Sequence, residues 1–368
     1  MDDVNVTIVG GGIVGLAIGA ALAEQHKGVF IIEKNWRIGL ESSTHNSGVI
    51  HSGIHYPPGS LKGRLCVRGN SLLYDICEKN GIGFKRTGKI TVASSNDYKE
   101  LEILRKQGEG NGVKGMVMLD SEGISRLEPL VSADSALYTP TSGIINQDEL
   151  IDYYYSKFIN NGGVLITESA VKEIKKENVG YKISGERRGG AFSFSSKTVI
   201  NSAGLYADKV AEAAGIDVES RGYRIKYCKG DYYRIDGNGP VSMLVYPVPG
   251  NEGLGIHLTP GMDGTVRLGP NTYYVNEINY RVETDADEFR NDVARYVPSI
   301  RKYKLTPDFA GIRAKLQGRG EGFRDFVIEE ESKYGLEGFI NLIGIESPGL
   351  TASPAIAEFV SEMYSKIV

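Results

Sequence analysis

The chain has 368 residues, of which 41% are hydrophobic and 24% are charged, and its 42 Lys and Arg against 46 Asp and Glu give a net charge of −4. This composition excludes a wholly disordered chain, and a mildly acidic chain without a Lys/Arg-rich block is a poor candidate for binding nucleic acid. The length predicts two or three domains. Glycine alone is unusual, because 47 of the 368 residues are about 13% of the chain, against a typical ~7%.

Residues 4–23 form an uncharged run that is long enough to span a membrane. The chain opens Met1-Asp2-Asp3 without a basic segment, however, and five glycines interrupt the run. We therefore expect a buried strand, a turn and a helix, in a cytoplasmic protein with at most a peripheral membrane contact. The three cysteines form no CxxC pair and no cluster with histidine, so we expect neither a disulfide framework nor a metal site.

The turn after the first predicted strand carries a GxGxxG motif. Gly10 would make the turn, Gly12 would let a pyrophosphate approach the backbone, and Gly15 would let helix and strand pack closely. Ile13 and Val14 open the predicted helix, whose N-terminus favours phosphate.

A second predicted strand at 29–32 ends at Glu33, which can accept hydrogen bonds from a ribose diol. A glycine-rich turn between two core elements is the alternative interpretation. It does not account for the strand, helix, second strand and terminal acid together, so we expect a dinucleotide site.

A polar loop rich in small residues follows Glu33 and favours FAD over NAD. An NAD-binding unit normally resumes helix and strand here, whereas a long loop suits the extended second half of FAD. Ser42, Ser43 and Ser47 offer hydroxyl groups to phosphate, and Gly48 leaves room for a flat ring. A long surface loop is the alternative. The other residues of this segment expected to contact the cofactor are Lys34, Asn46, Val49 and His51.

Several segments are similar to one flavoenzyme family. Residues 44–53 (THNSGVIHSG), 246–249 (YPVP), 311–313 (GIR) and 347–354 (SPGLTASP) resemble the L-2-hydroxyglutarate dehydrogenase/oxidase family, within the D-amino-acid oxidase and glycerol-3-phosphate dehydrogenase superfamily. The resemblance runs nearly end to end and implies FAD as the cofactor. It departs at Ala314, where we expect proline.

The resemblance also implies roles for later residues. Val171 would hold the adenine through backbone groups, and the turn at Ala203 and Gly204 would lie near the pyrophosphate. Near the end of the chain, a glycine loop with Gly349, Leu350 and Thr351 leads into a helix predicted over 351–367, with Ser353 as its cap and Pro354 as its first residue. The N-terminus of that helix would stabilise negative charge on a reduced flavin.

The remaining elements fall into two groups. Strands are predicted at 84–95, 164–166, 170–174, 181–183, 197–201 and 339–343, and helices at 96–111, 121–129, from 147, at 206–214 and at 286–296. Alternation with frequent turn residues from 223 to 274 indicates antiparallel sheet. We therefore predict an α/β fold (α+β overall). A Rossmann-like FAD-binding domain would comprise 1–83, 145–220 and 305–368, with an inserted, mainly antiparallel substrate domain of 84–144 and 221–304.

Candidate substrate residues are cationic or basic. Arg313 matches the position where the superfamily clamps a substrate carboxylate, and Arg324 is a candidate for a second carboxylate. Histidine is the natural base near neutral pH, so His257 and His55 are catalytic candidates, with Tyr246 as a further pocket residue. The alternative interpretations are a solvated face for the charge run around Arg313, particularly Lys315 and Arg319, and core packing for His257.

These features predict oxidation of L-2-hydroxyglutarate, or a closely related 2-hydroxy acid, to 2-oxoglutarate by hydride transfer to flavin N5. The electrons would pass to oxygen, a quinone or an electron-transfer protein. The alternatives are an amine or amino-acid oxidase, a glycerol-3-phosphate dehydrogenase, and a non-enzymatic flavin-binding redox module. The sequence leaves open the oligomeric state and whether His51 carries FAD covalently.

Overall fold

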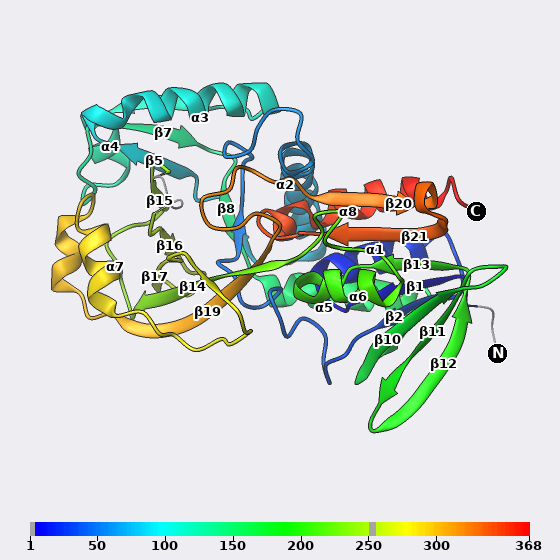
Figure 1. Ribbon diagram of the computed structural model, residues 1–368. Coiled ribbons are helices and arrows are strands. Elements are labelled where there is room, and N and C mark those ends of the chain that lie inside the picture. Colours follow the sequence, from blue (N-terminus) through cyan, green and yellow to red (C-terminus); the bar gives the residue numbers. More distant parts are fainter. Residues whose placement is uncertain (1–3, 250–254) are drawn as a thin grey trace.

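The computed structural model describes residues 4–249 and 255–368 and has two lobes (Figure 1). One lobe is built on a six-stranded sheet in the order β20-β21-β13-β1-β2-β9. Every neighbouring pair in it is parallel except β20–β21. Its strands are β1 (Val6–Val9), β2 (Val29–Ile32), β9 (Val164–Ile166), β13 (Thr198–Asn201), β20 (Val327–Glu331) and β21 (Leu336–Ile343).

Both faces of this sheet are covered, as the continuous apolar pattern of its inner strands requires. Val6 and Ile8 belong to the core formed with helices α1, α2, α5 and α8, whereas Val9 and Val199 belong to the core on the opposite face. The first helices are α1 (Ile13–Ala23), α2 (Leu61–Asn80), α5 (Gln147–Asn160) and α8 (Gly349–Tyr364). The opposite face carries α6 (Ala207–Ala213) and an antiparallel sheet of β10 (Ser169–Lys176), β11 (Tyr181–Arg187) and β12 (Gly190–Ser196).

The second lobe contains a nine-stranded, mainly antiparallel sheet. It includes β5 (Lys89–Ala93), β6 (Val117–Asp120), β7 (Ser135–Thr139), β14 (Lys226–Ile235), β15 (Leu244–Pro247), β16 (Leu258–Pro260), β17 (Val266–Leu268), β18 (Tyr273–Val275) and β19 (Thr306–Lys315). Helices α3 (Tyr98–Asn111), α4 (Ser121–Leu127) and α7 (Ala286–Val293) lie on its outer side. A third, small sheet is formed by β3 (Val49–Ile50), β8 (Gly143–Ile145) and β4 (Phe84–Lys85). It packs on both lobes, because Ile50 and Ile145 belong to the core with α1 and α8, whereas Val49 and Ile144 pack with residues of β15.

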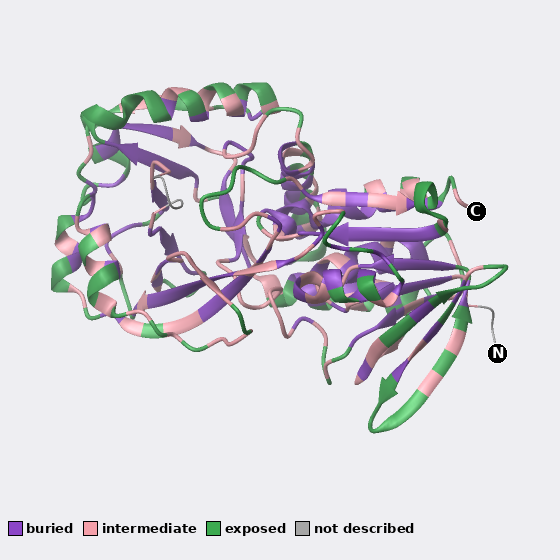
Figure 2. Ribbon diagram, viewed as in Figure 1, coloured by how far each residue is buried: buried purple, intermediate pink, exposed green. Residues whose placement is uncertain are grey.

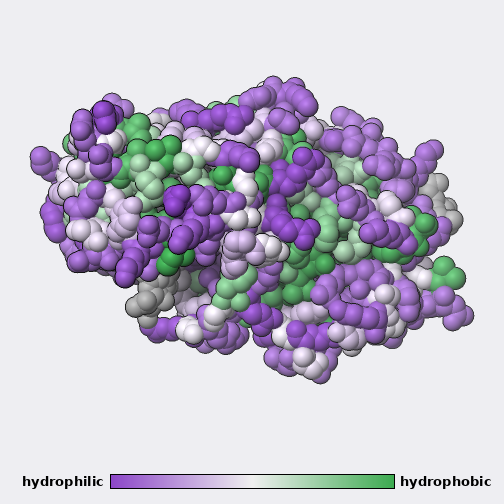
Figure 3. Space-filling view, turned by 90° about the horizontal axis from the view of Figure 1, so that it is seen from above, coloured by the Kyte–Doolittle hydropathy of each residue, from purple (hydrophilic) through white to green (hydrophobic). Residues whose placement is uncertain are grey.

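Burial and surface polarity follow this arrangement. The strands at the centre of both sheets are buried, whereas α3 and the β11–β12 hairpin expose much of their surface (Figure 2). Figure 3 shows mainly hydrophilic residues over one face of the molecule, with smaller hydrophobic patches among them. In the described part of the chain, no helix has the length and apolar character needed to cross a membrane.

The predicted fold class is confirmed, and three details differ from expectation. β19 falls within the predicted cofactor segment 305–368 but pairs with β14 in the large sheet. The twenty-residue helix α2, capped by Ser60, was not predicted. The last helix begins at Gly349, so Ser353 and Pro354 are not its cap and first residue: the Ala352 N–H already closes the first turn on the Pro348 carbonyl at 2.8 Å.

Candidate active site

The turn between β1 and α1 brings three chain segments together. Gly10 has φ +113°, and a Cβ there would lie 2.4 Å from the Ser202 carbonyl oxygen, so only glycine fits. The Glu33 carboxylate reaches back to the same turn: its Oε2 accepts from the Gly11 N–H at 2.8 Å, and its Oε1 accepts from the Asn35 N–H at 2.8 Å. Glu33 therefore fixes the GxGxxG turn as well as facing the site.

We predict that Glu33→Gln weakens FAD binding by about 10- to 100-fold. The glutamine NH₂ group would replace one of the two carboxylate oxygens and face a backbone N–H, which would lose its acceptor at a cost of about 1–3 kcal/mol. Fluorescence titration of the apoprotein with FAD measures this. Glu24→Gln is the control, since the Glu24 carboxylate pairs with Lys157 at the surface, away from the turn. Equal FAD affinity for the two variants would contradict the prediction.

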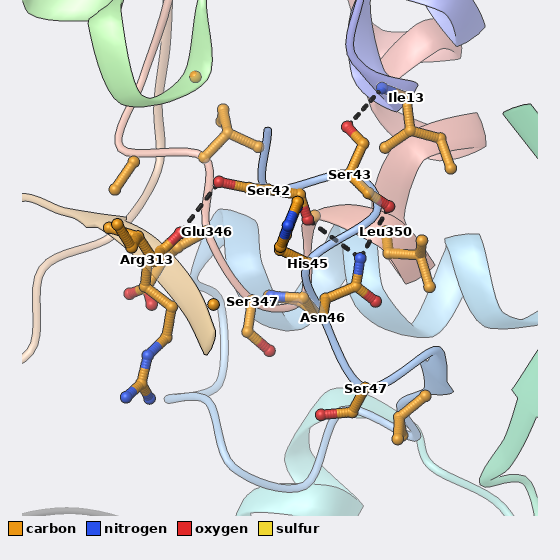
Figure 4. Close-up of a pocket in the computed structure, with 18 of the residues that line it drawn as sticks. Ile13, Ser42, Ser43, His45, Asn46, Ser47, Arg313, Glu346, Ser347 and Leu350 are labelled. Atoms are coloured by element: carbon orange, nitrogen blue, oxygen red, sulfur yellow. Dashed lines mark hydrogen bonds between the residues drawn. The ribbon is translucent and has the colours of Figure 1, made fainter. Parts of the chain in front are cut away.

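The serine-rich loop wraps around the N-terminus of α1. The Ile13 N–H donates to Ser43 Oγ at 2.9 Å, and Ser42 Oγ donates to the Ile312 carbonyl at 2.9 Å (Figure 4). Asn46 holds the loop from within, because its amide donates to the carbonyls of Ser42 and Ser43. The loop thus connects the cofactor turn to β19 of the large sheet.

Two adjoining cavities lie along this loop. The first is lined by fifteen of the predicted site residues: Gly12, Ile13, Val14, Ser42, Ser43, Asn46, Ser47, Val49, His51, Gly204, Tyr246, His257, Arg313, Gly349 and Leu350. The second is lined by Gly10, Gly12, Glu33, Lys34, Ser42, Ser43, Val171, Ala203 and Gly204. Because Gly12, Ser42, Ser43 and Gly204 line both, the cavities form one extended site.

The extended site fits FAD. The second cavity lies at the carboxyl ends of β1 and β2, where α1 presents its positive N-terminal end and Glu33 offers a carboxylate, as an adenosine diphosphate needs. The first cavity extends from the same helix end to the N-terminus of α8, and the flavin ring would occupy it. The chemistry that bound FAD would supply at this site is that of a hydride acceptor.

Thr351 fixes the start of α8 against the histidine loop. Its Oγ1 donates to the Val49 carbonyl at 3.1 Å and accepts from the His51 N–H at 3.0 Å, and the side chain is fully buried. Thr351 therefore positions Gly349 and Leu350 at the cavity without lining it.

Arg313, in β19 of the large sheet, lines the first cavity. Its Nη2 donates to Thr272 Oγ1 at 3.0 Å, and it lines the cavity together with Tyr232, Tyr246 and Glu346. Figure 4 shows Arg313 and Glu346 on the same side of the site. A guanidinium held from one edge leaves its remaining donors for a substrate carboxylate or phosphate.

Glu346 is paired behind the cavity with Lys62. The Lys62 Nζ lies 2.8 Å from Glu346 Oε1 and 3.0 Å from the Arg324 carbonyl, and only 4% and 7% of the Lys62 and Glu346 side chains are exposed. The charge of Glu346 is therefore balanced by a residue of α2 before any substrate binds.

We predict that Lys62→Met lowers the free energy of unfolding by about 3–5 kcal/mol, because it leaves the Glu346 carboxylate buried without a partner. Urea unfolding of the FAD-loaded protein measures this. Adding Glu346→Gln to Lys62→Met should restore much of the loss. Lys333→Met, at an exposed ion pair, is the control and should have little effect. A Lys62→Met variant as stable as the parent would refute the prediction.

The histidines take different places. His51 and His257 line the first cavity, and the His257 ring stacks on Tyr246 with 3.5 Å between ring centroids. Burial, and then the positive charge of Lys89, lower the pKa of His51 to about 3, so this imidazole is neutral at physiological pH. His55 lies behind the cavity, with its Nε2 3.0 Å from Lys89 Nζ.

Five predicted site residues do not line either cavity. Gly15 packs against the Gly10 carbonyl, from which a Cβ would lie 2.1 Å away. Gly48 donates its N–H to Asn46 Oδ1. Arg324 is exposed and donates to the Gly222 carbonyl, so it is not placed to bind a second carboxylate in the cavity. Thr351 and His55 lie behind the walls, as described above.

The structure also adds residues that were not predicted for the site. Tyr232 meets Ser47 Oγ through its hydroxyl at 2.9 Å, and Glu346, Ser347 and Ser202 line the cavity. Ser347 begins the segment 347–354, which resembles the flavoenzyme family, so the sequence did indicate that this segment belongs to the site. The Lys62–Glu346 pair joins residues 284 apart, and no local pattern indicates it.

The fold and the site define a flavin-dependent oxidoreductase, in which the residues from the β1–α1 turn to the N-terminus of α8 would hold FAD. Residues 5–363 match the family described as FAD dependent oxidoreductase (DAO), and the chain belongs to this family. FAD is accordingly its cofactor.

Relatives of known name fall into two groups. The chain is 31% identical to mitochondrial L-2-hydroxyglutarate dehydrogenase of Arabidopsis thaliana, over 98% of this chain and 83% of the relative. It is 32% identical to glycerol 3-phosphate dehydrogenase of Caloramator mitchellensis, over 99% of this chain and 74% of the relative. Among solved structures, FAD-bound L-α-glycerophosphate oxidase of Mycoplasma pneumoniae superimposes with a TM-score of 0.87 at 26% identity, covering 99% and 95% of the two chains.

Proposed function

We propose that the protein oxidises L-2-hydroxyglutarate, or a closely related 2-hydroxy acid, to the corresponding 2-oxo acid. The observation that carries this proposal is the guanidinium of Arg313 in a cavity that is also lined by His51 and His257 and adjoins the N-terminus of α8. Several relatives at 31–33% identity over nearly the whole chain are named L-2-hydroxyglutarate dehydrogenase, which supports the same substrate class.

In this proposal the residues act as follows. Arg313 binds the C1 carboxylate and orients the α-carbon toward the flavin. His257 accepts the hydroxyl proton as the carbon loses its hydride. His51, whose pKa is lowered to about 3, is too weak a base for this step.

Anaerobic mixing of the FAD-loaded protein with L-2-hydroxyglutarate tests the proposal. We expect the flavin absorption band to bleach, and the D-isomer to bleach it far more slowly. The panel includes L-lactate, L-malate, glycine, L-proline and sn-glycerol 3-phosphate. Failure of every 2-hydroxy acid to reduce the flavin would overturn the proposal.

Glycerol 3-phosphate is the second candidate substrate, favoured by Glu346. A carboxylate in the cavity wall suits a hydroxyl donor such as the end of a glycerol moiety better than a second carboxylate, while Arg313 would bind the phosphate. The relative from Caloramator mitchellensis supports this reading. Reduction by sn-glycerol 3-phosphate alone in the panel would establish it.

The electron acceptor belongs to the same proposal. Reoxidation of the reduced protein by air, by a soluble quinone and by an artificial one-electron acceptor distinguishes an oxidase from a dehydrogenase. Use of a quinone in a bilayer would require the peripheral membrane contact considered from the sequence.

A further inference from the structure

A buried lysine lies behind the cavity without an acidic partner. Lys89 is 1% exposed, in the strand β5 between β15 and β7. Its Nζ lies 3.0 Å from His55 Nε2 and 5.0 Å from the centroid of the Tyr246 ring. No carboxylate within residues 4–249 and 255–368 forms an ion pair with it, and burial lowers the pKa of Lys89 to about 7.

The contact between Lys89 and His55 fixes which atom carries a proton. Because the lysine nitrogen donates, His55 Nε2 accepts, so the proton of the neutral imidazole is on Nδ1. That buried Nδ1 has no hydrogen-bond partner among the described residues. Burial and the adjacent Lys89 charge lower the pKa of His55 well below its usual value, so the pair holds at most one added proton, on Lys89.

Among the residues that the structure describes, the titratable groups around this pair supply no negative charge. Lys89 faces His51 and Cys66, and His55 faces His51 and His257. Burial raises the pKa of the Cys66 thiol, so that it stays protonated. A charged lysine in these surroundings is costly, because a buried ion is stable only when it is paired.

We propose that Lys89, hydrogen-bonded to His55, is a positioning residue whose positive charge balances that of an anionic substrate. When an acid binds in the cavity as an anion, Lys89 takes up one proton from solvent. This proposal deepens the proposed function and rests on it for the choice of an acid as the ligand. Lys89 lines neither cavity, so it acts on the substrate through its charge and through the His51–His55–His257 cluster.

Calorimetry with glutarate, a dicarboxylate that lacks the oxidisable hydroxyl, tests this on the FAD-loaded protein. Titrations in two buffers with different ionisation enthalpies give the number of protons taken up. At pH 8 we expect an uptake of about one proton, and at pH 6 close to none, because Lys89 is already charged there. The Kd for glutarate should rise by up to about tenfold per pH unit above pH 7.

Two variants separate charge from structure. Lys89→Arg keeps the charge at every pH, so glutarate should bind without proton uptake and with a Kd that does not change between pH 7 and 9. Lys89→Met should bind glutarate more weakly and also without uptake. Proton uptake that persists in Lys89→Arg would overturn the proposal, and so would absence of uptake in the parent at pH 8, or failure of the parent to bind glutarate.

A direct titration of Lys89 does not depend on the activity of any variant. In the FAD-loaded parent labelled with ¹³C at lysine Cε, one resonance should titrate with a midpoint near pH 7, and glutarate should shift that midpoint to higher pH. The resonance is assigned to Lys89 if it is absent from the spectrum of Lys89→Arg. A Lys89 that titrates with the surface lysines would refute the inference. If a 2-hydroxy acid bleaches the flavin but Lys89 does not titrate in this way, the proposed function stands and the inference about Lys89 is wrong. If Lys89 titrates in this way but no 2-hydroxy acid bleaches the flavin, the inference stands and the proposed function is wrong.

Discussion

Replacing Gly10 by alanine should produce a protein that is purified without FAD and is less stable by about 3 kcal/mol. The added Cβ would meet three backbone atoms, the carbonyl oxygen and carbon of Ser202 at 2.4 and 2.8 Å and the Cα of Ala203 at 3.0 Å, and none of them can rotate away. The positive φ of Gly10 adds further strain. Since Ser202 and Ala203 also line the second cavity, separating the two turns displaces both walls of the cofactor site.

The measurements are the FAD-to-protein absorbance ratio, an FAD titration of the apoprotein and urea unfolding. We expect FAD affinity to fall by about 100-fold, which corresponds to about 3 kcal/mol. Gly322→Ala is the matched control, because a Cβ at Gly322 meets nothing within 4 Å and the residue has no positive φ. A Gly10→Ala protein that retains FAD at the parent level would show that the two turns can move apart.

Replacing Arg313 by methionine should lower kcat/KM for L-2-hydroxyglutarate by about 10³-fold, or about 4 kcal/mol, because the substrate carboxylate then enters the cavity without its guanidinium. Arg313→Lys keeps the charge but loses the planar fork, so an intermediate loss is expected. Stopped-flow flavin reduction under anaerobic conditions measures both. FAD content should remain unchanged, because Arg313 does not line the second cavity, where the adenosine diphosphate would bind.

Arg324→Met is the control for this experiment. The Arg324 side chain is exposed and bonded to the Gly222 carbonyl, so kcat/KM should stay within about twofold of the parent. A large loss in Arg324→Met would support the sequence-based role of this residue as a second carboxylate ligand. Equal losses in the two variants would contradict the assignment of Arg313 as the clamp.

The cofactor half of the site could be predicted from sequence because its signals are local. The GxGxxG turn, the acid at the end of the second strand and the small residues of the following loop occupy one continuous segment, and backbone chemistry restricts what each position can be. The same reasoning failed at the start of α8, where Ser353 and Pro354 have the chemistry of a helix start but lie inside a turn that had already closed.

The substrate half depends on contacts between distant segments, which no local pattern indicates. Lys62 lies in α2 and its partner Glu346 lies in the loop before α8. Tyr232 of β14 contacts Ser47 of the serine-rich loop. Lys89 contacts His55 from β5, a strand whose sequence resembles any alternating strand. Arg324 illustrates the converse: it is close in sequence to Arg313, but β19 ends between them, and the exposed Arg324 side chain donates to the Gly222 carbonyl instead of lining the cavity.

The chain order of the six-stranded sheet also governs when the cofactor can be enclosed. β1 carries the GxGxxG turn, yet its neighbour β13 pairs with β21, and α1 packs against α8. During synthesis the N-terminal segments emerge first. The first cavity, however, lacks one wall until residues 336–364 have been made. We therefore expect FAD to find a complete site only after residues 336–364 have been made, and a truncation before Gly349 should abolish FAD binding.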